Sequence, residues 1–371
     1  MDISEKIMTS EKLGAWRAGI PWETGGLAVL TGAFDILQPG NLTAVRRAAA
    51  CAGHVCVVVD GGETVSRESG ARPRRSLAER AETVSHLRHV SAVCAVKAGE
   101  EAARYFEPLR PYTHVVCSER GMDALSKEAD RLAGKRELLP ELPGCSTAEI
   151  VAAIREGKTP IKLPDAFMSC LSVLPRPSKA SRRGKPSRSV AEPATLQCNP
   201  TASHGGPRAP GPSDRQEAGK GRRIVVSVNG CFDVLHAGHL RFLAQARGMG
   251  DELIVLVNDD KSVGDYKGAK RPSSPAPASF VAARPIFPLE FRIEALLTLE
   301  SVSNVCPFGG DNPLKVLDLL RPDIHVKGGS YEPERVERER RLLESWGGSL
   351  RFCPMVENYS TSGWLDMVTG G

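Results

Sequence analysis

The 371-residue chain lacks the features that mark membrane-spanning, secreted and metal-centred proteins. It has no apolar run of the roughly 18 residues that a transmembrane helix needs. Residues 1–8 lack the apolar stretch of a signal peptide. The ten cysteines show no paired CxxC spacing, so we expect small apolar residues of a reduced protein rather than disulfides or zinc ligands. These absences predict a cytoplasmic protein without a membrane partner.

The chain also has little net charge for its length. Its formal charge is +5, and part of the excess lies between about Pro175 and Arg222, a segment rich in Pro, Ser, Gly, Arg and Lys. Because this segment has few large apolar residues, it cannot offset the entropy of ordering and is predicted to be a flexible linker. Its basic runs are interpreted as a solvated tether, so nucleic acid is not an expected partner.

One segment carries the strongest indication of chemistry. Asn229–Leu240 reads Asn-Gly-Cys-Phe-Asp-Val-Leu-His-Ala-Gly-His-Leu, between a predicted buried strand (Ile224–Val228) and a predicted helix (Arg241–Arg247). His236 and His239 therefore lie on the turn that opens a helix, where backbone N–H groups are unpaired and the helix dipole favours an anion. Two imidazoles at such a turn suit a polyphosphate whose negative charge grows during reaction.

The residues around the two histidines support a catalytic site. Gly238 removes a side chain where a phosphate has to approach the backbone closely. The simpler alternative is that the histidines only cap a surface helix. The HxGH pattern is weak on its own, but here it follows a strand, Gly230, Phe232 and Asp233 in order, which favours catalysis.

The sequence contains a second, earlier copy of this pattern. Thr31–Leu42 aligns without a gap with Asn229–Leu240, and the glycine, phenylalanine and aspartate of the motif are the same in both. A repeat of this length means two copies of one domain rather than a solenoid. Later segments of the two copies correspond in the same order: Val55–Asp60 with Leu253–Asn258, Leu77–Arg80 with Leu289–Arg292, Arg110–Val116 with Arg321–Lys327, and Gly144–Thr147 with Asn358–Thr361.

Each copy alternates short β-rich runs with helical stretches. This alternation predicts parallel strands joined by right-handed crossovers, with helices on both faces. The expected fold class is therefore α/β, with two tandem Rossmann-like, doubly wound parallel-sheet domains: a first copy at residues 1–170, a linker at 171–222 and a second copy at 223–371. Ligands of such sheets bind beyond the carboxyl ends of the strands at the switch point, where the HxGH turn is expected.

The motif of residues 229–239 resembles the signature of cytidylyltransferase-like nucleotidyltransferases, and it is most similar to heptose 1-phosphate adenylyltransferases. The resemblance continues over about residues 224–368. It implies that a phosphate oxygen of an acceptor attacks the α-phosphorus of a nucleoside triphosphate and that pyrophosphate leaves. ATP and a phosphorylated small molecule are the expected substrates, with Mg²⁺ bound mainly through the nucleotide phosphates and no protein side chain assigned as a metal ligand.

The resemblance also implies the catalytic residues. We expect His236 and His239 to contact the triphosphate and to stabilise the transition state. Lys267, in the segment similar to the family's lysine loop, is expected to bridge the acceptor and the α-phosphate. Arg292, similar to the family's helix-borne arginine, is expected to pair with phosphate in a fork that lysine could not copy.

Further residues are expected to bind the nucleotide. Ser360 and Thr361, at another predicted helix start, are expected to bind the outgoing phosphates. Asp233 has two open interpretations: it orients a histidine or the metal shell, or it fixes the turn. For Lys327, a surface lysine is the alternative to a position beside the base or sugar. The other expected nucleotide-binding residues are Asn229, Gly230, Cys231, Phe232, Gly238, Asn258, Asp259 and Gly328.

The first copy lacks these groups. Gln38 and Asn41 replace the two histidines, Val116 replaces the late-strand lysine, and Ser66–Gly70 offers no lysine of the loop. Amides carry no charge to match a growing negative charge, so we predict a pseudo-enzyme domain with a mainly structural role. The second copy also has a Pro-rich insert, Pro272–Ala278, that the first lacks, and we expect a mobile loop there.

The leading hypothesis is a transferase of AMP from ATP to a sugar 1-phosphate similar to heptose 1-phosphate. Two alternatives stay open. One is a cytidylyltransferase that uses CTP with glycerol 3-phosphate or phosphoethanolamine, since the tandem copies resemble the phosphoethanolamine enzymes in layout. The other is a non-catalytic nucleotide-binding regulator, which the intact residues of the second copy argue against. The assembly is expected to be a homodimer or an intramolecular pseudo-dimer.

Overall fold

The computed structural model describes residues 3–21, 25–61, 73–97, 99–110, 112–116, 124–140, 142–168, 223–268, 284–310, 312–329, 333–354 and 361–369. The predicted linker and the Pro-rich insert lie outside the described residues, as does Ser360. Across the ranges that the structure describes, no helix has both the length and the apolar character needed to cross a bilayer.

The first copy forms a parallel sheet with the order β1-β4-β3-β2-β5-β6 within the described residues. Strand β2 lies at its centre because its apolar residues need cover on both faces. The strands are β1 (Ile7–Met8), β2 (Leu27–Gly32), β3 (His54–Asp60), β4 (Ala92–Val96), β5 (Thr113–Val116) and β6 (Lys135–Leu138). The helices are η1 (Ile3–Lys6), α1 (Ser10–Ala18), α2 (Pro39–Cys51), α4 (Leu77–Ser85), α5 (Ala103–Phe106), η3 (Glu107–Leu109), α6 (Ala124–Leu132) and α7 (Thr147–Arg155).

The second copy repeats this topology. Its parallel sheet has the order β11-β10-β7-β8-β9, which matches β6-β5-β2-β3-β4 strand for strand in the described chain. The prediction of two tandem Rossmann-like parallel sheets is therefore confirmed. The strands are β7 (Val225–Gly230), β8 (Glu252–Asn258), β9 (Asn304–Phe308), β10 (Ile324–Gly328) and β11 (Ser349–Cys353), and the helices are α10 (Ala237–Arg247), α11 (Asp260–Gly268), α12 (Leu289–Leu297), α13 (Leu314–Leu320), α14 (Pro333–Glu344) and α15 (Thr361–Thr369).

Alternate residues of the central strands point to two different cores. Along β2, Leu27 and Val29 belong to an outer core with Phe106, whereas Ala28 and Leu30 belong to a core that both copies share. This period of two is the normal pattern of a strand that is buried on both faces. The inner faces of the two sheets therefore build one continuous hydrophobic core between the copies.

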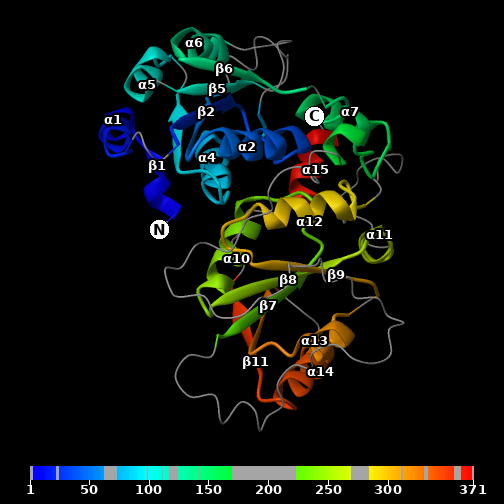
Figure 1. Cartoon of the computed structure of the whole chain (residues 1–371). Helices are drawn as coiled ribbons and strands as arrows, with labels where there is room; N and C mark the ends of the chain where they lie inside the picture. The colour runs from blue at the N-terminus through cyan, green and yellow to red at the C-terminus, as the bar shows by residue number, and fades with distance from the viewer. Residues whose placement is uncertain are drawn as a thin grey trace.

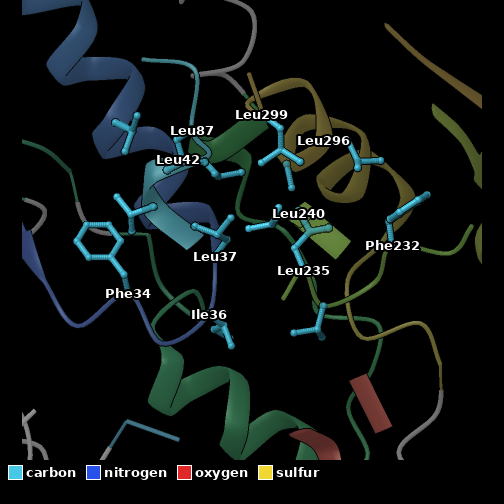
Figure 2. Close-up of a cluster of buried hydrophobic side chains, with 14 of the residues drawn as sticks. Phe34, Ile36, Leu37, Leu42, Leu87, Phe232, Leu235, Leu240, Leu296 and Leu299 are labelled. Atoms are coloured by element: carbon cyan, nitrogen blue, oxygen red, sulfur yellow. The ribbon is translucent and has the colours of Figure 1, made fainter. Parts of the chain in front are cut away.

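The centre of that shared core is made of leucines from both copies. Figure 2 shows Leu37, Leu42 and Leu87 of the first copy facing Leu235 and Leu299 of the second. Leu87 and Leu299 are fully buried and form an antiparallel bridge. Burying such side chains contributes about 1.5–3 kcal/mol each, so the copies are held together by packing as well as by polar contacts.

The contacts between the copies are arranged around an internal two-fold axis. The backbone N–H of Arg88 donates to Thr298 O at 2.8 Å, and the N–H of Glu300 donates to His86 O at 3.0 Å, which is the same contact in the reverse direction. Helix α15 packs against its own counterpart α7 (Figure 1). An interface that repeats its contacts in both directions has the geometry of a symmetric dimer, here within one chain.

Candidate functional site

The second copy gathers its predicted site residues at the carboxyl edge of the sheet. Asn229 and Gly230 end β7, Asn258 ends β8, and Lys327 and Gly328 end β10. Strand order reverses between β7 and β10, so this edge is the switch point where open α/β sheets bind ligands. The expected position of the site in the fold agrees with this arrangement.

His236 and His239 lie together at the N-terminus of α10. His236 is the N-cap residue, and its Nδ1 accepts a hydrogen bond from the backbone N–H of His239 at 3.3 Å. The two rings stack with their centroids 3.7 Å apart. Gly238 lies between them in the first turn of α10. Two imidazoles thus stand at a helix end whose dipole and backbone N–H groups attract an anion.

His236 is neutral at physiological pH. Burial and, to a smaller extent, the positive charge of Arg75 together lower its pKa to about 4. Because Nδ1 accepts from a backbone N–H, the ring hydrogen of the neutral form belongs on Nε2. His236 can therefore offer a neutral hydrogen-bond donor to a phosphate rather than a full positive charge.

The turn between β7 and α10 is built around Phe232. Its φ is 47°, and Phe34 in the first copy has the same left-handed conformation with φ 51°. The Phe232 ring packs edge-on against His239, with centroids 5.4 Å apart. A Cβ on Gly230 would lie 2.9 Å from this ring. Gly230 is therefore explained by the packing of Phe232, and the strained turn belongs to the fold of both copies.

Arg292 is fully buried and its described contacts are with the protein. Its Nη1 donates to Cys231 O and to Asn258 O, both at 2.7 Å, and its Nε donates to Phe287 O at 3.1 Å. Its Nη2 pairs with Asp260 at 2.7 Å. The guanidinium fork therefore joins the carboxyl ends of β7 and β8, and its expected pairing with phosphate stays a prediction.

The first copy repeats this use of a buried arginine. Arg80 Nη1 donates to Ala33 O and to Asp60 O, both at 2.6 Å, and its Nε donates to Arg75 O at 3.2 Å. These carbonyls are the counterparts of those that Arg292 binds. Because the first copy keeps this arrangement without the two histidines of the motif, the arginine has a positioning role that does not depend on them.

Asp233 fixes a turn, which was one of its two interpretations. Its carboxylate accepts from the backbone N–H groups of Ile286 and Phe287 at 2.9 Å, and it pairs with Arg284 at 2.7 Å. Asp35 likewise accepts from the backbone N–H of Arg75 in the first copy. The aspartate of the motif therefore anchors the segment that leads into α12 or α4.

Lys327 lies in a buried ion pair at the end of β10. Its side chain is fully buried, and its Nζ pairs with Glu339 of α14 at 2.7 Å. It also donates to Asn229 Oδ1 at 3.0 Å. Burial lowers the pKa of Lys327, and Glu339 opposes that shift. Lys327 is thus part of a buried ion pair that orients Asn229, and its contact with base or sugar stays a prediction.

Three further predicted residues, Asp259, Gly328 and Thr361, also contact other parts of the protein. Asp259 Oδ1 accepts from Ser262 N at 2.8 Å, as an N-cap residue does at a helix start. Gly328 is close to α10, since a Cβ there would lie 2.9 Å from the Phe242 ring. Thr361 begins α15, as predicted, and its hydroxyl donates to Val234 O at 3.5 Å.

Lys267 stands in the last turn of α11, but its side chain lies outside the described residues. Among the described side chains, no three His, Cys, Asp or Glu come together in a group that could hold a metal ion. The two carboxylates at the end of β8, Asp259 and Asp260, are engaged as a helix cap and as the partner of Arg292.

The first copy shows how its amides fit the same turn. Gln38 is the N-cap residue of α2, and its Oε1 accepts from the backbone N–H of Gly40. It therefore performs the capping that His236 performs in the second copy. The substitution keeps the helix start and removes the imidazole, which is consistent with the prediction of a pseudo-enzyme domain.

A family model described as Cytidylyltransferase-like matches residues 29–153 and 227–362, together more than half of the chain. The chain therefore belongs to the cytidylyltransferase-like family, as its motifs predicted, and each copy matches separately. Membership of this family supports nucleotidyl transfer as the class of reaction.

Curated relatives include the bifunctional protein HldE of Chromohalobacter salexigens, 40% identical over 149 residues, and that of Hahella chejuensis, 40% identical over 144 residues. These matches cover 40% and 39% of this chain, and 28% and 27% of the relatives. The matched part thus spans little more than a quarter of the relatives' length.

Two solved structures are similar at low scores. The lipopolysaccharide core biosynthesis protein from Thermoplasma volcanium is 23% identical with a TM-score of 0.29, covering 38% of this chain and 100% of that one. Pantothenate synthetase from Thermus thermophilus is 15% identical with a TM-score of 0.29, covering 46% of this chain and 83% of that one. Neither similarity bears on the function of this chain.

Sequence reasoning missed three residues that shape the site. The sequence gives only a weak indication that Glu339 is buried, because it shares a helix face with the apolar Leu343 four residues later. Arg284, the partner of Asp233, follows the Pro-rich insert and has no local motif. Arg75 belongs to the first copy and reaches the second only through the three-dimensional fold.

Proposed function

We propose that this protein is a nucleotidyltransferase that transfers AMP from ATP to a sugar 1-phosphate similar to heptose 1-phosphate. One observation carries the proposal: two stacked imidazoles stand at the N-terminus of α10, over the switch point of a parallel sheet. Helix ends of this kind bind phosphate, and imidazole N–H groups can follow the charge that develops on it. The family and its histidine motif support the reaction class.

In the proposed reaction, a phosphate oxygen of the acceptor attacks the α-phosphorus of ATP. The bond from the α-phosphorus to its bridging oxygen breaks, and pyrophosphate leaves with that oxygen. His236 and His239 donate hydrogen bonds to the phosphates as their charge shifts toward the leaving group. Thr361 and Ser360, at the start of α15, bind the outgoing phosphates, and Lys267 bridges the acceptor and the α-phosphate. Positioning and charge stabilisation supply the rate enhancement.

Mg²⁺ is proposed to enter with the nucleotide. The carboxylates nearest the strand ends, Asp259 and Asp260, already serve as a helix cap and as the partner of Arg292. A cation at this edge would therefore be held mainly by phosphate oxygens and water, which suits Mg²⁺. When bound, it would neutralise part of the triphosphate charge.

The sugar 1-phosphate acceptor rests on sequence similarity. The motif Asn-Gly-Cys-Phe-Asp and the Lys-Gly-Gly turn at residues 327–329 resemble the heptose 1-phosphate adenylyltransferases, and the relatives named HldE support that choice. The cytidylyltransferase alternative has one observation in its favour, the face-to-face tandem copies in Figure 1. The two differ in the base and in the acceptor.

A pyrophosphate-release screen tests the proposal. The full chain is assayed with each of four nucleoside triphosphates against a panel of sugar 1-phosphates, glycerol 3-phosphate and phosphoethanolamine. Release that requires ATP and a sugar 1-phosphate supports the proposal, and release with CTP and either other acceptor supports the alternative. The variant His236→Gln is the matched control, because glutamine performs this capping in the first copy. Release that persists in this variant would place the activity elsewhere.

A further inference from the structure

The interface between the copies contains two kinds of contact. Some are approximately reciprocal: Arg46 of α2 pairs with Glu294 of α12, and Arg241 of α10 pairs with Glu82 of α4 at 2.5 Å. Glu82 and Glu294 are counterparts in the two copies. Such pairs hold the copies together without distinguishing one from the other.

Other contacts run in a single direction, and one of these reaches the histidine turn. Arg75, just before α4, donates from Nη1 to the carbonyl of Leu235 at 2.9 Å. Leu235 is the residue before His236. The counterpart of Arg75 in the second copy is Phe287, whose fully buried ring has no polar group to return the contact. The first copy therefore reaches toward the histidine turn of the second, and the reverse contact is not made by this position.

The backbone of Arg75 is itself fixed. Its N–H donates to Asp35 Oδ1 at 2.9 Å, and its carbonyl accepts from Arg80 Nε at 3.2 Å. Asp35 and Arg80 are among the motif residues that the first copy retains although Gln38 and Asn41 replace the two histidines of the motif. Their retention has a function in this geometry, because they hold a cation that faces the other copy.

We propose that the first copy contributes to the histidine site of the second copy. Arg75 is a positioning residue that holds the Leu235–His236 turn and so orients the His236–His239 pair. This inference rests on the proposed function for its kinetic consequence. The hydrogen bond to Leu235 O fixes the backbone from which His236 caps α10. The guanidinium charge also acts on the ring of His236, which stacks on His239.

The test compares Arg75→Gln with Arg75→Lys and with Arg46→Gln as the matched control. Arg46→Gln removes an ion pair between the copies that does not involve the histidine turn. The readouts are the titration of the His236 imidazole by NMR in the full chain, the urea midpoint, and kcat and KM for pyrophosphate release.

For Arg75→Gln we expect the pKa of His236 to rise from about 4 toward its ordinary value while staying below it, since burial remains the larger cause. We expect kcat to fall roughly tenfold or more with a smaller change in KM, because a hydrogen bond from a charged group to the turn is lost. Arg75→Lys should keep the lowered pKa, and Arg46→Gln should change neither the titration nor kcat.

Two results would overturn the inference and leave Arg75 as an ordinary interface residue. One is an unchanged His236 titration in Arg75→Gln, and the other is an equal loss of kcat in Arg46→Gln. The titration needs no substrate. A wild-type chain that is inactive with every substrate pair would therefore refute the proposed function, while the NMR comparison would still decide the role of Arg75.

Discussion

Removing one partner of the Lys327–Glu339 pair should destabilise the fold far more than removing both. The Lys327 side chain is fully buried and Glu339 is 1% exposed, and they are 2.7 Å apart. In Glu339→Leu the ammonium keeps Asn229 as a described partner but loses its carboxylate. An uncompensated buried charge costs about 3–5 kcal/mol, a large part of a total stability of about 5–15 kcal/mol.

The opposite single variant, Lys327→Met, should lower the free energy of unfolding by less. In Lys327→Met the carboxylate of Glu339 still has Arg335 at 3.7 Å, and that side chain is 23% exposed. In the double variant Lys327→Met/Glu339→Leu, apolar side chains of similar volume replace the pair, which is commonly neutral or stabilising. The first copy already carries Val116 at the lysine position, so this sheet edge accepts an apolar residue.

Urea denaturation of the wild type, both single variants and the double variant completes the cycle. We expect the free energy of unfolding to fall most in Glu339→Leu, less in Lys327→Met, and to return within about 1 kcal/mol of wild type in the double variant. Two single variants as stable as wild type, or a double variant that loses the sum of the single losses, would refute the buried ion pair.

Three further predictions follow from the site. His239→Ala should lower the turnover of pyrophosphate release by about 10²–10³ with an unchanged thermal midpoint, since single preorganised donors contribute that much; turnover equal to wild type would contradict the assigned site. The free energy of unfolding should fall as pH drops from 6.5 to about 4, because burial lowers the pKa values of His236 and His86 to about 4 in the fold while the unfolded chain takes up protons near 6.5. That loss reaches up to about 3 kcal/mol per histidine, and urea titrations of His236→Gln across this range should have a shallower slope. Gly230→Ala should destabilise the turn, since its Cβ would lie 2.9 Å from the Phe232 ring, and Phe232→Leu should relieve the effect in a denaturation assay.

Local patterns predicted the fold well. The apolar run at Ile224–Val228 became β7, shifted by one to two residues, and the helix predicted from Arg241 begins at Ala237 because His236 caps it. The gap-free match between Thr31–Leu42 and Asn229–Leu240 predicted two copies, and the two sheets share one strand order.

Residue roles were harder to predict, because they depend on contacts that sequence spacing does not encode. Arg292 binds backbone carbonyls, which have no sequence signature, so a positioning arginine has the same pattern as one that binds phosphate. Lys327 pairs with Glu339 of α14, a contact that the sequence spacing does not indicate. His236 is neutral because it is buried beside Arg75 of the other copy, and neither cause is visible from the motif.

A structure of the full chain with a non-hydrolysable ATP analogue and Mg²⁺ tests the central claim most directly. We predict triphosphate oxygens within hydrogen-bond distance of His236 and His239 at the N-terminus of α10, with the base near the ends of β7 and β10. Nucleotide bound only in the first copy, or away from this helix end, would contradict the account.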